Sequence, residues 1–251
     1  MKRSPAEEPA SAGSGSGPFD PVPAEVLDEQ LAYYGARAPE YDRWFLREGR
    51  YDRGPASTQA WRRELGEVQQ LLDGICLDGQ DVLELAAGTG LWTRALLERG
   101  ATVTAIDASP KMLAELATRL GNAALSVIVA DLFSWVPPRR FDAVVSCFFM
   151  SHVPDERFDG FAELIAASLH AGGTVFLVDS QRVDTSTAAD HVLPSGQDQT
   201  MRRHLDDGRT FTIVKRFRDD AELVDALAAR GVNAEVHRTP TYFQVVTGTR
   251  T

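Results

Sequence analysis

Residues 82–90 read VLELAAGTG, an apolar run that leads directly into two glycines. Its first four residues are typical of a buried strand, and the glycines that follow form a turn that opens a helix over residues 90–99. Small residues and glycines let a ligand approach the backbone closely, and the helix N-terminus presents free N–H groups and the positive end of the helix dipole. The stretch therefore predicts a binding turn for a ligand that carries a carboxylate or a phosphate.

Strands and helices alternate after this turn, which predicts a parallel sheet covered on both faces. The sequence around Asp206-Asp207-Gly208-Arg209 separates two alternating apolar runs and predicts a β-hairpin after the fifth strand. We therefore expect an α/β fold, a Rossmann-like seven-stranded mostly parallel sheet with helices on both faces. The ranges with strand character in that sheet are 82–85, 102–106, 125–130, 141–146, 174–178, 234–238 and 242–247.

The domain organisation follows from changes in composition along the chain. Residues 1–23 are rich in Pro, Ala, Ser and Gly, which predicts a disordered tail. Residues 24–251 are expected to form one domain. Its expected parts are an N-terminal helical region (24–75), a cofactor-binding core (76–180), an insertion with the hairpin (181–217), and a final helix with two strands (218–251).

Composition excludes several classes of partner. The chain has 26 Lys+Arg against 36 Asp+Glu, a net charge of −10, and such a surface repels phosphate backbones, so no nucleic-acid partner is expected. No run approaches the roughly 20 apolar residues that cross a bilayer, so no membrane partner is expected. Cys76 and Cys147 lie in apolar surroundings and indicate thiols of a reducing compartment. We expect a cytoplasmic monomer or homodimer with a small-molecule substrate.

Two aspartates follow the next two strands. Asp107 ends the second strand, about 20 residues beyond the glycines, where an acid accepts hydrogen bonds from both hydroxyls of a ribose. Asp131 follows the third strand and can accept from the amine of an adenine, with Leu132 and Met112 packing on the ring. A nicotinamide cofactor is disfavoured, because Thr93 stands where the third glycine of G-x-G-x-x-G is required.

Four motifs in this order resemble class I S-adenosylmethionine-dependent methyltransferases. They are ELAAGTG at 84–90, AIDAS at 105–109, ADLF at 130–133 and FDAVVS at 141–146. The resemblance implies that S-adenosyl-L-methionine is the cofactor, S-adenosyl-L-homocysteine the product, and that no metal is needed. The residues that it places around the cofactor are Glu84, Ala86, Gly88, Thr89, Gly90, Asp107, Ala108, Met112, Asp131, Leu132 and Cys147.

A closer resemblance rests on residues 30–42, 151–158 and 207–215. They look like those of a bacterial group of small-molecule methyltransferases of secondary metabolism, which includes the phosphonate O-methyltransferase of dehydrophos biosynthesis. That group implies a mobile N-terminal helical lid and a hairpin over the active site, with Tyr41 closing over the amino-acid part of the cofactor. The chain departs from the phosphonate enzyme at Cys147 and Phe148 and in a longer insertion over residues 180–199, and these differences leave the acceptor open.

Candidate acceptor-side residues lie after the fourth strand and on the hairpin. The near-neutral reference pKa of histidine would suit His152 as a general base, and a histidine hydrogen-bonded inside a turn fits its place as well. Arg202 and Arg203 are adjacent on a strand, so at most one faces the pocket, where its guanidinium would pair with a phosphonate or carboxylate. The other histidines lack metal-ligand spacing, which predicts no metal.

Aromatic residues near the lid allow two interpretations. Tyr33, Tyr34, Trp44 and Phe148 either line an acceptor pocket or staple the lid helix to the core. We predict methyl transfer from S-adenosylmethionine to a small metabolite, with O-methylation of an anionic acceptor as the first hypothesis. The alternative is C- or N-methylation of an aromatic, indole-like acceptor. A catalytically silent cofactor-binding regulator is a third hypothesis, which the intact glycines and acids disfavour.

Overall fold

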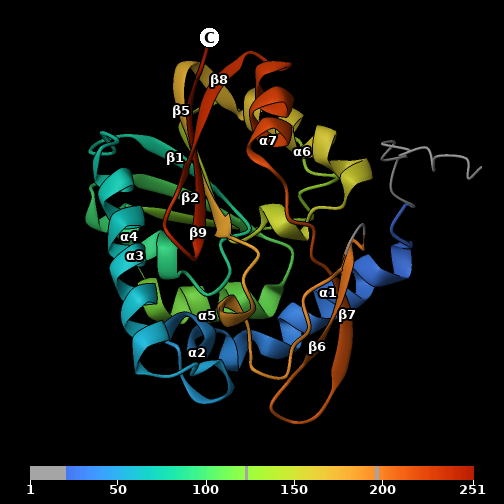
Figure 1. Cartoon of the computed structure of the whole chain (residues 1–251). Coiled ribbons are helices and arrows are strands. Elements are labelled where there is room, and N and C mark those ends of the chain that lie inside the picture. Colours follow the sequence, from blue (N-terminus) through green and yellow to red (C-terminus); the bar gives the residue numbers. More distant parts are fainter. Residues whose placement is uncertain (1–20, 122–123, 196–197) are drawn as a thin grey trace, which may run out of the picture.

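The computed structural model describes residues 21–121, 124–195 and 198–251. Its centre is a seven-stranded sheet with strand order β3-β2-β1-β4-β5-β9-β8 (Figure 1). Strands β1 to β5 run parallel, and β9 pairs antiparallel with both β5 and β8. The predicted Rossmann-like, mostly parallel sheet is confirmed. Its strands are β1 (Asp81–Leu85), β2 (Thr102–Asp107), β3 (Leu125–Val129), β4 (Phe141–Cys147), β5 (Leu169–Ser180), β8 (Val232–Arg238) and β9 (Phe243–Arg250).

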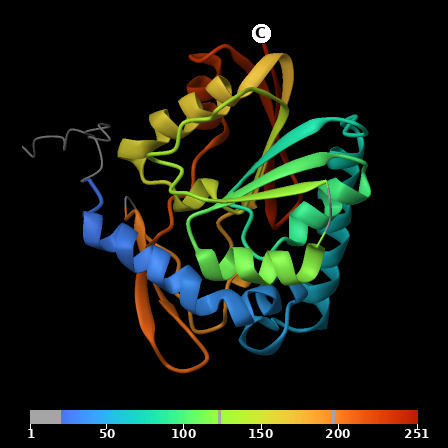
Figure 2. The ribbon, with the colours of Figure 1, turned by 180° about the vertical axis from the view of Figure 1, so that it is seen from behind.

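Helices cover both faces of the sheet, because successive strand residues point to opposite sides. In β1, Val82 belongs to the apolar cluster beneath α3, α4 and α5, while its neighbour Leu83 belongs to the cluster beneath α6 and α7. The two views in Figures 1 and 2 show these two helical layers. The helices are α3 (Pro55–Asp73), α4 (Leu91–Glu98), α5 (Pro110–Leu120), α6 (Asp155–Ser168) and α7 (Asp220–Ala228).

An N-terminal helix and a hairpin lie beyond the carboxyl ends of the central strands. Helix α1 (Ala24–Arg37) runs along β7 (Thr210–Val214), which pairs antiparallel with β6 (Thr200–His204) (Figures 1 and 2). Tyr33 of α1 packs against Met201 and Ile213 of the hairpin in a separate apolar cluster. The lid and the hairpin therefore form one packed unit over the edge of the sheet where α/β folds bind ligands.

Short segments complete the lid. After α1 come a 3-10 turn (Ala38–Glu40), α2 (Tyr41–Leu46) and a second 3-10 turn (Gly49–Tyr51). Of the predicted tail, residues 1–23, the first 20 residues lie outside the described part of the chain. At its end, the Val22 N–H donates to Glu156 Oε1 at 2.8 Å.

None of the helices among the described residues has the length and apolar character needed to cross a membrane.

Candidate functional site

Three cavities that share lining residues lie at the carboxyl ends of β1, β2 and β4. The largest, of about 280 Å³, lies between the sheet and α1 and is called the main cavity here. A polar cavity of about 30 Å³, called the acceptor pocket, lies toward the hairpin, and a third, of about 20 Å³, lies at the glycine turn. Tyr41 and Phe148 line all three cavities, so these two rings stand at their junction.

The glycine turn leaves room for a ligand. Ala86 and Gly88 both have positive φ angles, 57° and 58°, and both line the main cavity. A Cβ built on Gly88 meets nothing within 4 Å, whereas one on Gly90 would lie 2.9 Å from Leu116. Gly90 is therefore required for packing against α5, and Gly88 borders open space on the ligand side.

Glu84 is a buried carboxyl at the end of β1, and it lines the cavity at the glycine turn. The Thr93 hydroxyl donates to Glu84 Oε2 at 2.6 Å. Burial raises the pKa of Glu84 to about 8, which the Thr93 hydrogen bond opposes. Thr93, which breaks the dinucleotide motif, thus orients a carboxyl that is suited to receive a cationic group. No local sequence pattern indicates this role of Thr93.

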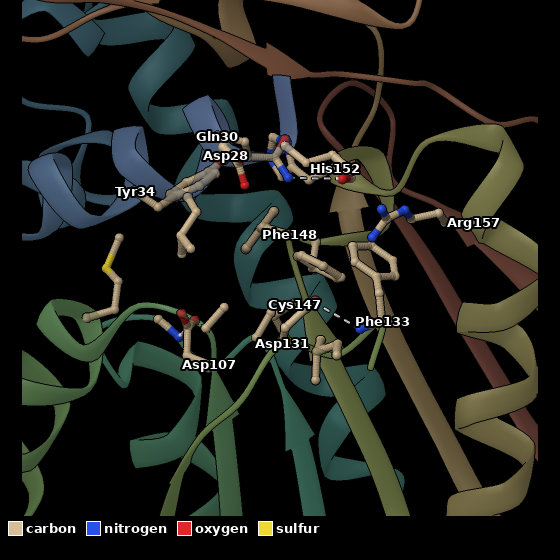
Figure 3. Close-up of a pocket in the computed structure, with 18 of the residues that line it drawn as sticks. Asp28, Gln30, Tyr34, Asp107, Asp131, Phe133, Cys147, Phe148, His152 and Arg157 are labelled. Carbon is tan, nitrogen blue, oxygen red and sulfur yellow. Dashed lines mark hydrogen bonds between the residues drawn. The ribbon is translucent and has the colours of Figure 1, made fainter. Parts of the chain in front are cut away.

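Asp107 and Asp131 face the main cavity from the sheet side. The Gly88 N–H donates to Asp107 Oδ2 at 2.9 Å and the Ser109 N–H donates to Asp107 Oδ1 at 2.8 Å, so backbone groups orient this carboxylate. Burial raises the pKa of Asp107. Asp131 is more exposed, and its Oδ1 accepts from the Phe133 N–H at 3.0 Å. Figure 3 shows both aspartates across the cavity from Tyr34 of α1.

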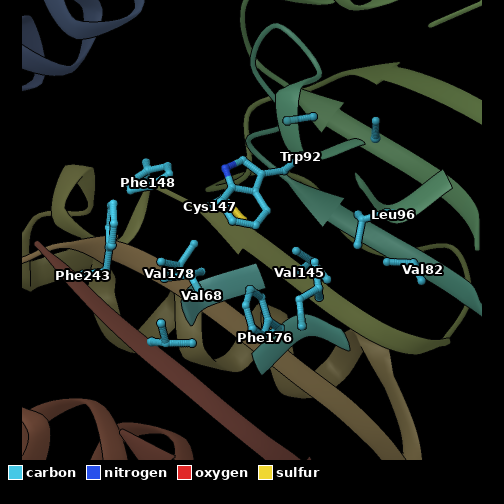
Figure 4. Close-up of a cluster of buried hydrophobic side chains, with 14 of the residues drawn as sticks. Val68, Val82, Trp92, Leu96, Val145, Cys147, Phe148, Phe176, Val178 and Phe243 are labelled. Carbon is cyan, nitrogen blue, oxygen red and sulfur yellow. The ribbon is translucent and has the colours of Figure 1, made fainter. Parts of the chain in front are cut away.

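The remaining cofactor-side candidates line the cavities with apolar surface. Ala108, Met112 and Leu132 border the main cavity, and Cys147 borders both this cavity and the one at the glycine turn. Burial raises the pKa of the Cys147 thiol well above its usual range, so the thiol is neutral. Figure 4 shows Cys147 next to Trp92 within the apolar cluster that fills the sheet face beneath α3 and α4.

The lid is tied to the glycine turn through Asp42. Thr89 Oγ1 donates to Asp42 Oδ1 at 2.7 Å, and Arg119 of α5 pairs with Asp42 Oδ2. These contacts hold α2, and with it Tyr41, against the turn. Gln30 fastens α1 in the same way, because its Nε2 donates to the carbonyl of His152 at 3.2 Å.

His152 is buried between the lid and the hairpin. Its Nδ1 lies 2.7 Å from the Val214 carbonyl oxygen, which can only accept, so Nδ1 carries the proton. Its Nε2 lone pair therefore accepts the hydroxyl of Tyr34 at 2.7 Å. Burial and the nearby charge of Lys215 lower the pKa of His152 to about 3. The ring is neutral, and its one acceptor site is engaged.

The acceptor pocket gathers charged side chains from three segments that are distant in sequence, the lid, β5 and the hairpin. Arg37, Lys215 and Arg203 line it together with Asp179, and all four are buried. Lys215 Nζ lies 3.5 Å from Asp179 Oδ1 and donates to Ser151 Oγ at 2.7 Å. Arg37 and Arg203 have no carboxylate partner within the described part of the chain.

Arg37 is the least satisfied of these cations. It is 4% exposed, and its Nε and Nη2 have no hydrogen-bond partner among the residues that the structure describes. Its guanidinium lies 4.8 Å from the ring centroid of Tyr41 and 5.5 Å from that of Tyr51. A buried donor without an acceptor is costly, which indicates that a ligand completes the site.

Some of the acceptor-binding residues predicted from the sequence line the acceptor pocket, and others do not. Arg203 points into the acceptor pocket with 6% exposure, whereas Arg202 is exposed. Tyr34 and Trp44 line the acceptor pocket, and Tyr33 lines none of the three cavities. Three further pocket residues, Arg37, Asp179 and Lys215, were not among the acceptor residues predicted from the sequence. Arg37 and Lys215 lie in the stretches that carry the closer resemblance, and Asp179 is an acid near the end of an apolar strand.

Phe148 carries backbone strain at the junction of the cavities. Its backbone φ angle is 61°, a value that residues other than glycine seldom adopt. Its ring packs edge-on against the Trp44 ring, with 4.8 Å between the centroids. The Trp44 indole N–H donates to the Ser186 carbonyl at 2.8 Å. Backbone strain at a residue other than glycine is typical of functional sites, where it fixes the direction of a side chain.

Within the described ranges, no three His, Cys, Asp or Glu side chains gather as metal ligands.

Comparisons with known proteins agree with this geometry. A family model described as a methyltransferase domain matches residues 82–173. The solved structure named "DhpI-SAH complex structure" is 34% identical, covers 91% of this chain and 98% of its own, and superposes with a TM-score of 0.73. The chain is a class I S-adenosylmethionine-dependent methyltransferase. The structure named "DhpI-SAM-HEP complex" is 36% identical with a TM-score of 0.72, covering 91% of this chain and 99% of its own.

Curated relatives match this methyltransferase more narrowly. An uncharacterized methyltransferase of Geobacillus thermodenitrificans is 35% identical over 41% of this chain and 47% of its own length. A ubiquinone biosynthesis O-methyltransferase of Idiomarina loihiensis is 30% identical over 55% of this chain and 60% of its own. The chain thus aligns with about half the length of these curated relatives.

The cavities fit the cofactor of this family. S-Adenosylmethionine carries an ammonium, a carboxylate, a ribose and an adenine. Glu84 would hold the ammonium, because it is a buried carboxyl with a single hydroxyl donor. The turn at Gly88 and the start of α4 would take the carboxylate, and the main cavity has acids where a ribose and an adenine need acceptors.

Proposed function

We propose that this methyltransferase moves a methyl group to an oxygen of a small anionic acceptor, with a phosphonate as the head group that suits the acceptor pocket best. The observation that carries the proposal is the charge of that pocket. Arg37, Arg203 and Lys215 face a single carboxylate, Asp179, so two positive charges lack a counterion among the described residues. An uncompensated buried charge is unfavourable, and an anionic acceptor would remove that cost.

The roles of the chain's own residues follow from this charge pattern. When bound, the cofactor supplies a methyl group on a positively charged sulfur. Arg203 and Arg37 would bind the acceptor's oxygens and orient one of them toward the cavity junction. Lys215, held by Ser151 and Asp179, would add the third positive group. Tyr41, where the cavities meet, would exclude water from the reacting groups.

An anionic oxygen is already a nucleophile, so this proposal assigns no proton transfer to His152. Its contacts favour a positioning role, since the neutral ring links Tyr34 to the Val214 carbonyl. The aromatic alternative has less support. The acceptor pocket is small and lined by charges, and Trp44 and Phe148 pack against each other there.

Mass spectrometry with isotopically labelled S-adenosylmethionine tests the proposed function. The acceptor panel would hold ethylphosphonate, propionate, phenol, butylamine and indole. We expect label in the methyl ester of ethylphosphonate. Label on the ring carbon or nitrogen of indole would replace the proposal with the aromatic alternative. Tight cofactor binding with no label on any acceptor would favour the silent regulator.

The pH dependence of turnover gives a second test. Because the pKa of His152 is lowered to about 3, the imidazole stays neutral from about pH 5 to pH 9. We expect kcat for ethylphosphonate to show no limb near the usual histidine pKa of about 6.5. The measurement is a pH–rate profile of wild type and His152→Gln. A limb near pH 6.5 that disappears in the variant would make His152 a general base.

A further inference from the structure

The segment that follows β5, residues 184–191, lies between the lid and the hairpin. The Ser186 carbonyl accepts from the Trp44 indole at 2.8 Å, and the Ala189 N–H donates to the Arg50 carbonyl at 3.1 Å. Both Trp44 and Arg50 belong to the lid. Hydrogen bonds from the lid therefore hold residues 184–191 in place, and we call this segment the bracket.

Two bracket side chains contact the guanidinium of Arg203. Arg203 Nη1 donates to Thr187 Oγ1 at 2.5 Å and lies 3.0 Å from His191 Nδ1. Arg203 Nε has no hydrogen-bond partner in the described ranges. One side of the guanidinium is thus held by the bracket, which leaves its Nε for a ligand of the acceptor pocket.

His191 separates two arginines as a neutral ring. Its Nε2 accepts from the His204 N–H at 3.1 Å and lies 3.4 Å from Arg50 Nη2, so Nε2 carries the lone pair. The proton is on Nδ1, which donates to Thr187 Oγ1 at 3.1 Å and cannot accept from Arg203 Nη1, so His191 orients Arg203 through the Thr187 oxygen that both groups share. Burial, together with Arg203 and Arg50, lowers the pKa of His191 to about 3.

The other charges that act on His191 do not change this assignment. Asp190 pairs with Arg50 and draws the pKa of His191 upward, while Arg37 lies on the side of the acceptor pocket and lowers it. The neutral ring adds no positive charge between Arg50 and Arg203, and its Nδ1–H orients the Thr187 oxygen that accepts from Arg203 Nη1. A flexible arginine loses less freedom on binding when its orientation is already set, so this arrangement favours anion binding.

We propose that Thr187 and His191 are positioning residues that hold Arg203 for the acceptor and thereby determine how strongly the pocket selects an anion. The inference rests on the proposed function, because it takes Arg203 as the group that binds the acceptor. It adds that the bracket contributes to acceptor affinity without touching the cofactor. Neither residue lines the main cavity.

Calorimetric titration of ethylphosphonate into the full chain, saturated with S-adenosylhomocysteine, tests the proposal. Thr187→Val keeps the side-chain shape and removes the oxygen, and His191→Phe removes both ring nitrogens. We expect each change to weaken ethylphosphonate binding about tenfold, with the affinity for S-adenosylhomocysteine unchanged. His191→Gln, which can still accept the His204 N–H, should recover part of the loss. The control His170→Phe, on the exposed side of β5, should change neither affinity.

A double-mutant cycle distinguishes positioning from general destabilisation. In an Arg203→Met background, Thr187→Val should cause no further loss of ethylphosphonate binding, because the group it positions is gone. An equal loss in both backgrounds, or full affinity in Thr187→Val and His191→Phe, would overturn the positioning role alone. If Arg203→Met itself binds ethylphosphonate as wild type does, or wild type does not bind it, the proposed function fails and this inference with it.

Discussion

Arg203→Met should lower kcat/KM for an anionic acceptor by about 30-fold or more, because truncating one partner of a buried charge contact costs about 2–5 kcal/mol. Methionine keeps the apolar stem that packs in the hairpin and removes the guanidinium. The affinity for S-adenosylmethionine should stay within about twofold of wild type. The measurement is steady-state kinetics with ethylphosphonate, together with calorimetric cofactor titration.

Arg202→Met is the matched control for this experiment. Arg202 precedes Arg203 on the same strand, carries the same charge and is exposed. Because adjacent strand residues point to opposite faces, its loss should leave kcat/KM nearly unchanged. Equal losses in the two variants would mean that the effect comes from overall charge rather than from a contact in the pocket, and would contradict the assignment of Arg203.

Glu84→Gln should weaken S-adenosylmethionine binding by at least about 30-fold, because an amide cannot compensate the buried ammonium. The pKa of about 8 means that Glu84 holds a proton in the free protein at neutral pH. Binding of an ammonium requires the ionised form, so the proton must leave. The affinity should therefore rise with pH between about 6 and 7, by up to about tenfold per unit.

Calorimetry in buffers of different ionisation enthalpy measures this proton release directly. Wild type should release a proton on binding at about pH 7, whereas Glu84→Gln should release none and show a nearly flat affinity. Glu98→Gln, an exposed change on the helix that follows the glycine turn, is the control and should behave as wild type. Proton uptake by wild type, or unchanged affinity in Glu84→Gln, would remove Glu84 from the ammonium site.

Much of the cofactor side could be predicted from the sequence because its residues lie next to one another along the chain. Glu84 and Gly88 belong to one strand and the turn that follows it, and Asp107 ends the adjacent strand. Parallel strands bring their carboxyl ends to the same edge, so strand order and motif position together place these groups. The hairpin after β5 was predictable for a similar reason, since its turn chemistry is local.

The acceptor side could be predicted only in part. Strand alternation reduced Arg202 and Arg203 to one pocket residue, but only the packing of the hairpin on α1 decides which of them faces inward. The same holds for Tyr33 and Tyr34, which are adjacent on α1 and diverge, with Tyr33 buried against the hairpin and Tyr34 lining the cavities. The protonated nitrogen of His152 is likewise set by Val214, which is distant in sequence.

Local sequence patterns are enough to predict the parallel sheet, the glycine turn, the acids at the carboxyl ends of the first three strands and the existence of a hairpin. Periodicity, turn residues and short motifs act over a few neighbouring residues, and each carries its own signal. Only the tertiary structure decided the charge of the acceptor pocket. Arg37, Asp179, Arg203 and Lys215 come from the lid, the fifth strand and the hairpin. These side chains come together only because the three elements pack against one another, and no short sequence pattern predicts that packing.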